Sequence, residues 1–233
     1  FCARVGATNT HLVTPHGLHD DAHYSTARDL ATISCYAMKN ETFREIVGTK
    51  ITKISNESGA SERVIKNKNR LLSEMSEATG IKTGYTKKAG RCFVGSAKRD
   101  DVEVVCILLN CGPMFEESET LLKRALDEFK MVSLVEPYET HEVSVTNSES
   151  KCAHIYSPKG FKYPLRNEEL SSIYIERDIP ESIVAPLKAN QKIGQLRISL
   201  DKNLIFCDNF YAVTSVDSND YFSNVKKIIE EMA

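Results

Sequence analysis

The sequence predicts an α+β protein: helices packed on an antiparallel sheet, followed by a small all-β sandwich. Two observations carry this prediction. Up to about residue 131, segments in which apolar residues recur at helical spacing alternate with strand-like segments. Beyond that point, short runs of alternating polar and apolar residues are separated by turn residues roughly every 8–12 positions, as is typical of a β-sandwich.

The N-terminal region predicts two helices and a strand. Apolar residues recur at helical spacing in residues 26–40, and Ser25 or Thr26 can cap this helix through a side-chain oxygen. A short helix is predicted over residues 42–47. Residues 49–54 alternate with a period of two and predict a strand.

Strand formers dominate from Gly80 to about residue 109. The polar stretch before them, residues 56–80, predicts a long loop with short helical turns. Residues 93–109 predict a hairpin with a charged turn at 97–101, and its nearly continuous apolar second arm predicts a central strand covered on both faces. An amphipathic helix is then predicted over residues 118–129, with Ser118 as its N-cap.

The domain boundary is expected near residues 131–134, which divides the chain into residues 1–132 and 133–233. The strand-like runs of the second part are residues 141–147, 151–158, 171–178, 194–201 and 209–216. Residues 220–233 predict a closing amphipathic helix. There are no internal repeats.

Composition excludes several classes of protein. The formal net charge of −2 gives no reason to expect nucleic acid as a partner. No stretch of 18 apolar residues exists, so no membrane-spanning segment is predicted. The first residues, FCARVGATNTH, resemble neither a signal peptide nor a natural start, which suggests a polypeptide that begins inside a longer protein.

The seven cysteines are scattered and include no C-x-x-C pair. Metal ligation favours close pairs, so no metal is expected, and most of the thiols are predicted to be buried and inert. A disulfide between Cys92 and Cys106, or between Cys92 and Cys111, stays open. An acidic and histidine-containing cluster, at positions 19, 20, 21 and 23, matches no common ligand spacing and is interpreted as a turn.

The segment GIKTGYT, residues 80–86, has the chemistry of a clamp for an extended anionic ligand. Lys82 supplies a positive charge and Thr83 a hydroxyl donor. Gly84 removes the side chain that would keep a ligand backbone from pairing with the strand. The backbone N–H of Tyr85 could face a reacting carbonyl oxygen, as in an oxyanion hole. The tripeptide KTG alone also fits an ordinary solvated strand end.

The wider context resolves this ambiguity, because KTG is one of three motifs of penicillin-binding proteins and β-lactamases, beside S-x-x-K and S-D-N. In order along the chain, five segments resemble the D-alanyl-D-alanine carboxypeptidases, which are low-molecular-mass penicillin-binding proteins. They are residues 8–31, 42–50, 67–72, 80–90 and 185–196. The last segment matters most, because it resembles the β-rich second domain that these carboxypeptidases carry and β-lactamases lack.

The resemblance implies a serine-type enzyme that removes the terminal D-alanine from peptidoglycan stem peptides through an acyl-enzyme, without a cofactor or metal. Lys82 and Thr83 would hold the substrate's terminal carboxylate as part of the catalytic site, with Lys82 also helping to shuttle protons, and Gly84 would leave room for the substrate's backbone. The N–H of Tyr85 would be an oxyanion donor, and Thr86 would support the strand. Many relatives have histidine at the position of Tyr85, so the role of its side chain is open.

Two further residues are candidates for substrate binding. Lys68, in NKN, stands where relatives often place an arginine near the carboxylate pocket, and a lysine there keeps the charge but not the bidentate fork. A plain surface lysine is the alternative. His16, in PHGL, could lie at the edge of the groove or hold its own loop.

The expected nucleophile is not in this sequence. Residues 1–81 contain neither S-x-x-K nor S-x-N, both of which precede KTG in the family. SESK (148–151) and SND (218–220) come after KTG, in a polar turn and before the terminal helix, and are not predicted to be catalytic. The chain therefore resembles the C-terminal part of a carboxypeptidase and is expected to be inactive alone.

Two alternatives remain beside the carboxypeptidase. One is a non-catalytic cell-wall-binding or regulatory relative that lost the serine, and the other, disfavoured by the second domain, is a β-lactamase. The resemblance implies an extracytoplasmic location, a D-Ala-D-Ala stem peptide as substrate and β-lactam antibiotics as inhibitors. Its terminal helix, residues 220–233, could contact a membrane surface or pack on its own domain.

Overall fold

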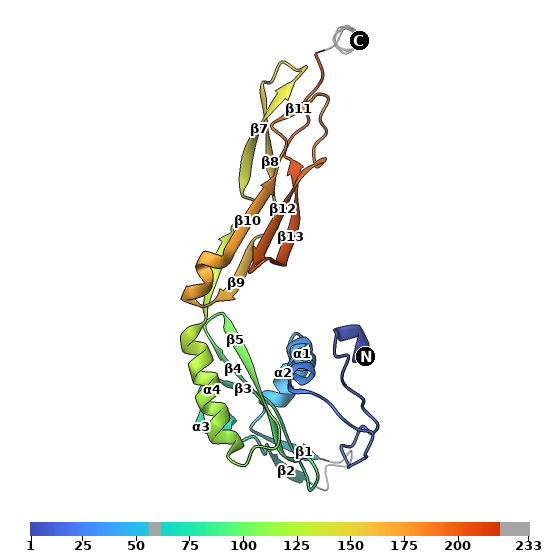
Figure 1. Cartoon of the computed structure of the whole chain (residues 1–233), viewed down its shortest axis with the longest axis vertical. Helices are drawn as coiled ribbons and strands as arrows, with labels where there is room; N and C mark the ends of the chain where they lie inside the picture. Colours follow the sequence, from blue (N-terminus) through green and yellow to red (C-terminus); the bar gives the residue numbers. More distant parts are fainter. Residues whose placement is uncertain (56–61, 220–233) are drawn as a thin grey trace. The chain divides into compact units, whose positions relative to one another are not determined.

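A computed structural model describes residues 1–55 and 62–219 of the chain, shown in Figure 1. The chain forms two compact units, residues 1–130 and the part that begins at Met131. The fold is a mixture of helices and sheets, as the sequence predicts: the sheets of the first unit are antiparallel, the larger sheet of the second unit contains one parallel pair, and the long helices described lie in the first unit. A short 3₁₀ turn, Ala3–Val5, opens the chain.

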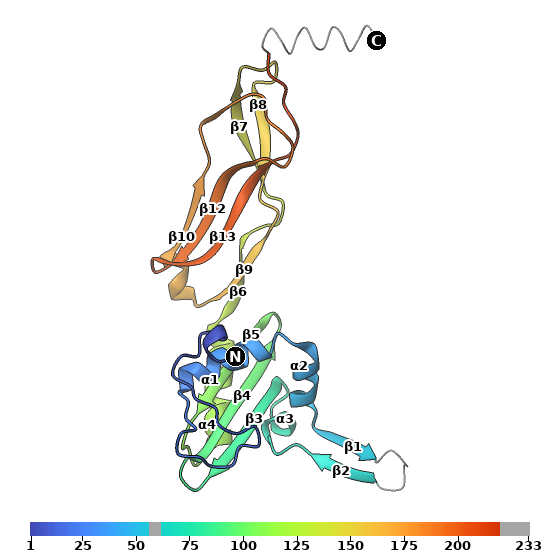
Figure 2. The same ribbon diagram turned by 90° about the vertical axis from the view of Figure 1, so that its right-hand side faces the viewer.

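The first unit is organised around a three-stranded antiparallel sheet in the order β3-β4-β5. Its strands are β3 (Ala78–Thr86), β4 (Gly90–Arg99) and β5 (Val102–Leu108). Helix α1 (Ala27–Ala37) contacts one face of this sheet, and helix α4 (Met114–Glu128) contacts the other, as Figures 1 and 2 show.

The helices before the sheet form where the sequence predicts them. Thr26 caps α1, because its side-chain oxygen accepts a hydrogen bond from the backbone N–H of Asp29 at 3.1 Å. Asn40 caps α2 (Glu41–Gly48) in the same way, through the N–H of Phe43. Helix α2 packs on β3.

The prediction of a loop with short helical turns before β3 is wrong in one respect. The polar stretch before β3 contains a strand, β2 (Glu62–Lys66), which pairs antiparallel with β1 (Ile51–Ser55). Its residues are exposed on both faces, so its pattern carries no signal of burial. A short helix, α3 (Leu71–Glu74), ends this stretch and buries Leu71 in the core.

The apolar second arm of the hairpin is β5, which lies at an edge of the sheet in the described part of the chain, whereas β4 is central. Its apolar run reflects the two helices that cover it, α1 and α4, rather than a central position. The charged turn is shorter than predicted and consists of Asp100 and Asp101.

Ser118 does not cap α4. The helix begins four residues earlier, and Ser118 lies inside it, fully buried, with its hydroxyl 2.7 Å from the thiol of Cys106. Ser118 stands in the polar stretch EESET, just before the apolar residues recur at helical spacing, and so resembles a cap, but its hydroxyl has its partner on the neighbouring strand.

The second unit is a small β-sandwich. Its larger sheet has the strand order β10-β12-β13-β8-β7-β11, and β6 pairs with β9 in a separate two-stranded sheet. Val135 of β6 packs with Val143, Ile155, Leu196 and other side chains of the larger sheet in one hydrophobic cluster. The two sheets therefore enclose a common core.

Four of the five strand-like runs of the second unit are confirmed, as β7 (Thr140–Thr146), β8 (Cys152–Tyr156), β10 (Ile173–Asp178) and β12 (Lys192–Leu200). The fifth, residues 209–216, overlaps only the end of β13 (Asn203–Ala212), which begins six residues earlier than predicted. Three strands were not predicted, namely β6 (Lys130–Val135), β9 (Phe161–Leu165) and β11 (Ser182–Val184), and neither was the 3₁₀ segment Asn167–Ser172. The predicted terminal helix, residues 220–233, lies outside the described residues.

All seven cysteines lie in the described ranges and are free thiols, so neither disulfide forms. The prediction that they are buried is wrong, because three are exposed and four are half-buried. Cys152 and Cys207 occupy the outward-facing positions of strands whose alternate residues are buried. Among the described helices, none has the length and apolar character needed to cross a bilayer.

Candidate active site

The KTG residues lie on a strand with a free edge. In the described part of the chain, β3 pairs with β4 on one side and has no strand neighbour on the other. Alternate backbone amides and carbonyls along such an edge face away from the sheet and can bind an added strand. Lys82 and Gly84 are exposed there, and the Nζ of Lys82 donates to the carbonyl oxygen of Thr83 at 2.5 Å.

The described chain leaves space for a side chain at Gly84. A Cβ there would find its nearest non-neighbouring atom, the carbonyl oxygen of Cys92, only at 4.0 Å. Its backbone is also outside the positive-φ region. Neither packing nor conformation within the described chain therefore requires glycine, unlike at Gly95, where a Cβ would lie 2.7 Å from the hydroxyl of Ser118.

Lys68 is held beside this strand by the two asparagines that flank it. The side-chain amide of Asn67 donates to the backbone carbonyls of Val47 and Thr49, at 3.3 and 3.0 Å. The buried Asn69 accepts from the N–H of Leu71 at 3.1 Å, which starts α3. With both asparagines turned toward the protein, the loop is fixed and presents Lys68 to the groove.

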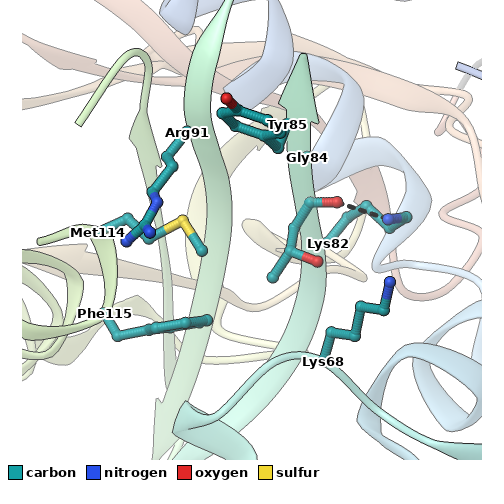
Figure 3. A pocket seen from close by; sticks show the side chains of 8 residues that line it. Lys68, Lys82, Gly84, Tyr85, Arg91, Met114 and Phe115 are labelled. Atoms are coloured by element: carbon teal, nitrogen blue, oxygen red, sulfur yellow. Dashed lines mark hydrogen bonds between the residues drawn. The ribbon is translucent and has the colours of Figure 1, made fainter. Parts of the chain in front are cut away.

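These residues meet around one groove of about 580 Å³, shown in Figure 3. Its lining comprises Lys68, Lys82, Thr83, Gly84, Tyr85, Arg91, Met114 and Phe115. They come from four parts of the first unit: the loop before α3, strand β3, strand β4 and the first turn of α4. Thus five of the seven candidate residues, Lys68 and the four residues from Lys82 to Tyr85, lie together.

The groove is cationic. It is lined by the side chains of Lys68, Lys82 and Arg91 and by no carboxylate. None of the three forms an ion pair with a carboxylate of the described residues. Like charges gathered in one concave site repel each other and create a positive potential, so the groove favours an anionic ligand.

The other two candidates lie outside the groove lining. Thr86 is at the end of β3, where its hydroxyl accepts from the N–H of Ala89 and closes the turn to β4. The exposed His16 accepts from the N–H of Leu18 through Nδ1, at 3.1 Å, and so holds its own loop. For His16, the structural alternative fits these contacts better.

The neighbouring acidic and histidine cluster is also built from local contacts. Asp21 pairs with Lys88 and lies 3.1 Å from His19, and these two partners hold the pKa of Asp21 below its usual value. Asp20 accepts from the N–H of Ala22. Within the described residues, no group of three or more acidic, histidine or cysteine side chains is arranged to hold a metal ion.

Sequence reasoning missed three lining residues: Arg91, Met114 and Phe115. The sequence did contain a signal for the position of Arg91. Residues Lys87 to Ala89 fit a three-residue hairpin loop that is followed by a glycine in the left-handed conformation, and Gly90 has φ +70°. Such a loop sets the register between β3 and β4. Thr83 then pairs with Phe93, and Tyr85 pairs with Arg91. Phe115 stacks edge-on against Phe93, with ring centroids 5.2 Å apart, which places the start of α4 at the groove.

Comparison with known proteins assigns the chain to a family. The family model described as D-alanyl-D-alanine carboxypeptidase matches residues 2–112, and that of the penicillin-binding protein 5 C-terminal domain matches residues 129–218. The chain belongs to the D-alanyl-D-alanine carboxypeptidase family of low-molecular-mass penicillin-binding proteins.

Individual members of this penicillin-binding protein family match along most of the chain. The D-alanyl-D-alanine carboxypeptidase DacF of Bacillus subtilis is 24% identical over 212 residues, 86% of this chain and 53% of DacF. DacC of Escherichia coli is 27% identical over 247 residues, 97% of this chain and 56% of DacC. The chain spans about half the length of these curated relatives.

The crystal structure of penicillin-binding protein 5 from Haemophilus influenzae shares the fold, with a TM-score of 0.66 and 24% identity over 93% of this chain and 63% of that one. At this level of identity the likeness shows the fold alone. It supports the assignment of the chain to a penicillin-binding-protein fold with a β-rich second domain.

The serines of SESK and SND both lie in the second unit. Ser148, in SESK, is half-buried and donates to the carbonyl of Ser150 within its turn. Ser218, in SND, is buried in the second unit. Neither belongs to the lining of the groove around Lys82.

Proposed function

We propose that the protein is a serine-type D-Ala-D-Ala carboxypeptidase of the bacterial cell wall, located outside the cytoplasm, and that this chain forms the groove wall that grips the substrate's C-terminus. The observation that carries the proposal is the free edge of β3 in the described part of the chain, where Lys82 lines a cationic groove. Gly84 lies beside Lys82, and packing within the described chain does not require a glycine there.

The roles of the groove residues follow from their chemistry. The ligand peptide adds to β3 as an antiparallel strand, with its terminal carboxylate at Lys82 and the hydroxyl of Thr83. Gly84 lets the ligand backbone approach, and Thr86 holds the end of the strand. Lys68 adds a second positive charge near the carboxylate. The N–H of Tyr85 stabilises the oxyanion that forms when a serine attacks the amide.

The reaction proceeds by acyl transfer. A serine oxygen forms a bond to the carbonyl carbon of the penultimate residue, the C–N bond breaks, and the departing nitrogen takes a proton to leave as D-alanine. Water then cleaves the ester. The serine and its activating lysine are the parts of the mechanism that residues 1–81 do not contain. This chain by itself is therefore inactive, and it forms no covalent adduct with a β-lactam.

The decisive experiment compares this chain with the longest polypeptide encoded in frame with it. D-alanine release from a D-Ala-D-Ala peptide and labelling by fluorescent penicillin are measured for both. The carboxypeptidase proposal expects both signals in the longer polypeptide and neither in the chain alone. A stable penicillin adduct on the chain alone, or a longer polypeptide with no S-x-x-K and no turnover, contradicts it.

A non-catalytic cell-wall-binding relative is the second candidate, because the groove around Lys82 could also bind a D-Ala-D-Ala end without cleaving it. It predicts D-Ala-D-Ala-dependent binding without D-alanine release by any natural form of the protein. A β-lactamase would instead turn over penicillin rapidly. Membrane contact through residues 220–233 is a further part of the proposal, tested by co-sedimentation with liposomes of the chain with and without those residues.

A further inference from the structure

Arg91 lines the groove but is not part of the KTG motif or of any other motif discussed above. It lies on β4 directly across from Tyr85, and its side chain lines the same groove as Lys68 and Lys82. Figure 3 shows it extending from β4 toward Met114, on the opposite side of the groove from Lys68. It is thus separated from the two lysines that the proposed function assigns to the terminal carboxylate.

The guanidinium has spare hydrogen-bonding capacity. An arginine carries five N–H donors in a planar fork. The described residues supply one acceptor, the carbonyl oxygen of Gly112, which lies 3.3 Å from Nη1. No carboxylate of the described residues pairs with Arg91, whereas the nearby Arg70 is paired with both Glu74 and Glu116. A planar fork with free N–H groups is suited to bind a carboxylate through two parallel hydrogen bonds.

The surroundings fit the side chain of a peptide residue. Met114 and Phe115 are half-buried and line the groove beside Arg91. The ring of Phe115 is fixed between Phe93 and the guanidinium of Arg70, whose carbon lies 5.2 Å from the ring centroid. A methylene chain can pack on this apolar surface while a carboxylate at its end reaches Arg91.

The position of Arg91 selects which part of the ligand it meets. A ligand strand antiparallel to β3, with its C-terminus at Lys82 and Thr83, runs toward Tyr85 and Thr86 in the direction of its own N-terminus. The end of the groove formed by Tyr85 and Arg91 therefore receives the acyl-donor side of the scissile amide.

We propose, resting on the proposed function, that Arg91 is a specificity-determining residue that binds a side-chain carboxylate of the acyl-donor part of the stem peptide. The favoured substrate is a D-Ala-D-Ala peptide in which the residue before the two D-alanines carries a free carboxylate. Amidation of that carboxylate removes its charge and one acceptor, and weakens binding.

The test measures the binding of three short peptides to this chain by NMR titration. Two peptides end in D-Ala-D-Ala and differ only in whether the preceding residue bears a side-chain carboxylate or the corresponding amide. A third ends in L-Ala-L-Ala. We expect the carboxylate peptide to bind about tenfold more tightly than the amide peptide, as for a charge-assisted hydrogen bond. Arg91→Gln should abolish this preference, so that the carboxylate and amide peptides bind to the variant equally.

Lys87→Gln is the matched control, because it removes one positive charge from the adjacent turn at a position outside the groove lining. It should keep the preference. If the D-peptides bind better than the L-peptide but the carboxylate and amide forms bind equally, the role of Arg91 is refuted and the proposed function stands. If the D- and L-peptides bind equally, or none binds, the proposed function is refuted as well. Equal losses in both variants would indicate general electrostatics and also refute the role.

Discussion

The guanidinium of Arg44 binds both carboxylate oxygens of Glu103, with N–O distances of 2.6 and 2.8 Å. The two residues are 59 positions apart, and their pairing ties helix α2 to strand β5. Arg44 also donates to the carbonyl of Met38, and Glu103 accepts from the hydroxyl of Thr79 on β3. This network connects the elements that position the KTG strand.

Replacing Arg44 should destabilise the first unit. In Arg44→Gln the carboxylate of Glu103 keeps only the Thr79 hydroxyl as a partner, so we expect the free energy of unfolding to fall by about 1–2 kcal/mol, the range for a charged hydrogen-bonded pair that is partly solvated. Urea unfolding measures the change. Arg28→Gln, at an exposed α1 position, is the control and should unfold like the wild type. Equal midpoints for both variants would show that the pair contributes nothing.

Gly84 and Gly95 should respond oppositely to alanine. Gly84→Ala should unfold at the same or slightly higher urea concentration, because a Cβ there meets no atom closer than 4.0 Å and alanine lowers the entropy of the unfolded chain. Its binding of D-Ala-D-Ala peptides should nevertheless be lost. Gly95→Ala should cost about 1–3 kcal/mol through overpacking against Ser118 and Phe93. Unimpaired peptide binding by Gly84→Ala would argue against a ligand strand on β3.

Acid should weaken the contact between Glu77 and Arg99. The hydroxyl of Ser76 and then the guanidinium of Arg99 lower the pKa of Glu77 from 4.5 to about 2. Because the pKa is lower in the folded state, the stabilisation is fully present above pH 4.5 and is lost as the pH falls toward 2. Glu77→Gln should therefore flatten the pH dependence of urea unfolding within this window and leave it unchanged near neutral pH. An unaltered slope would contradict the assignment.

Helix α4 supplies a pair of adjacent leucines with different burial. Leu122 is 1% exposed and Leu121 is 42% exposed. Leu122→Ala should destabilise the first unit by about 2–5 kcal/mol, because it leaves a cavity between the helix and the sheet, whereas Leu121→Ala should change little. Thermal or urea unfolding of both variants distinguishes them. Similar losses in the two would mean that α4 packs with a different face toward β4 and β5.

Local pattern predicted most of the elements that have one apolar face. Helices α1 and α2 and the strands of the second unit have apolar residues on one face, so their periodicity is visible in the sequence. Strand β2 was missed because its residues, ERVIK, lack the alternation that marks its equally exposed partner β1, and the pairing of the two strands is a backbone interaction. Ser118 was misplaced because its buried contact with Cys106 joins two elements that are apart in the chain.

The sequence by itself determined the family, the strand that carries Lys82, Thr83 and Gly84, and the β-rich character of the second unit, because contiguous motifs and periodic burial record these features directly. Only the tertiary structure decided that Lys68 and Arg91 share a groove with Lys82. That convergence depends on the register of a hairpin, on two asparagines that fix a loop and on where a helix begins. Spacing along a chain does not specify which distant side chains meet, since their proximity results from packing in three dimensions.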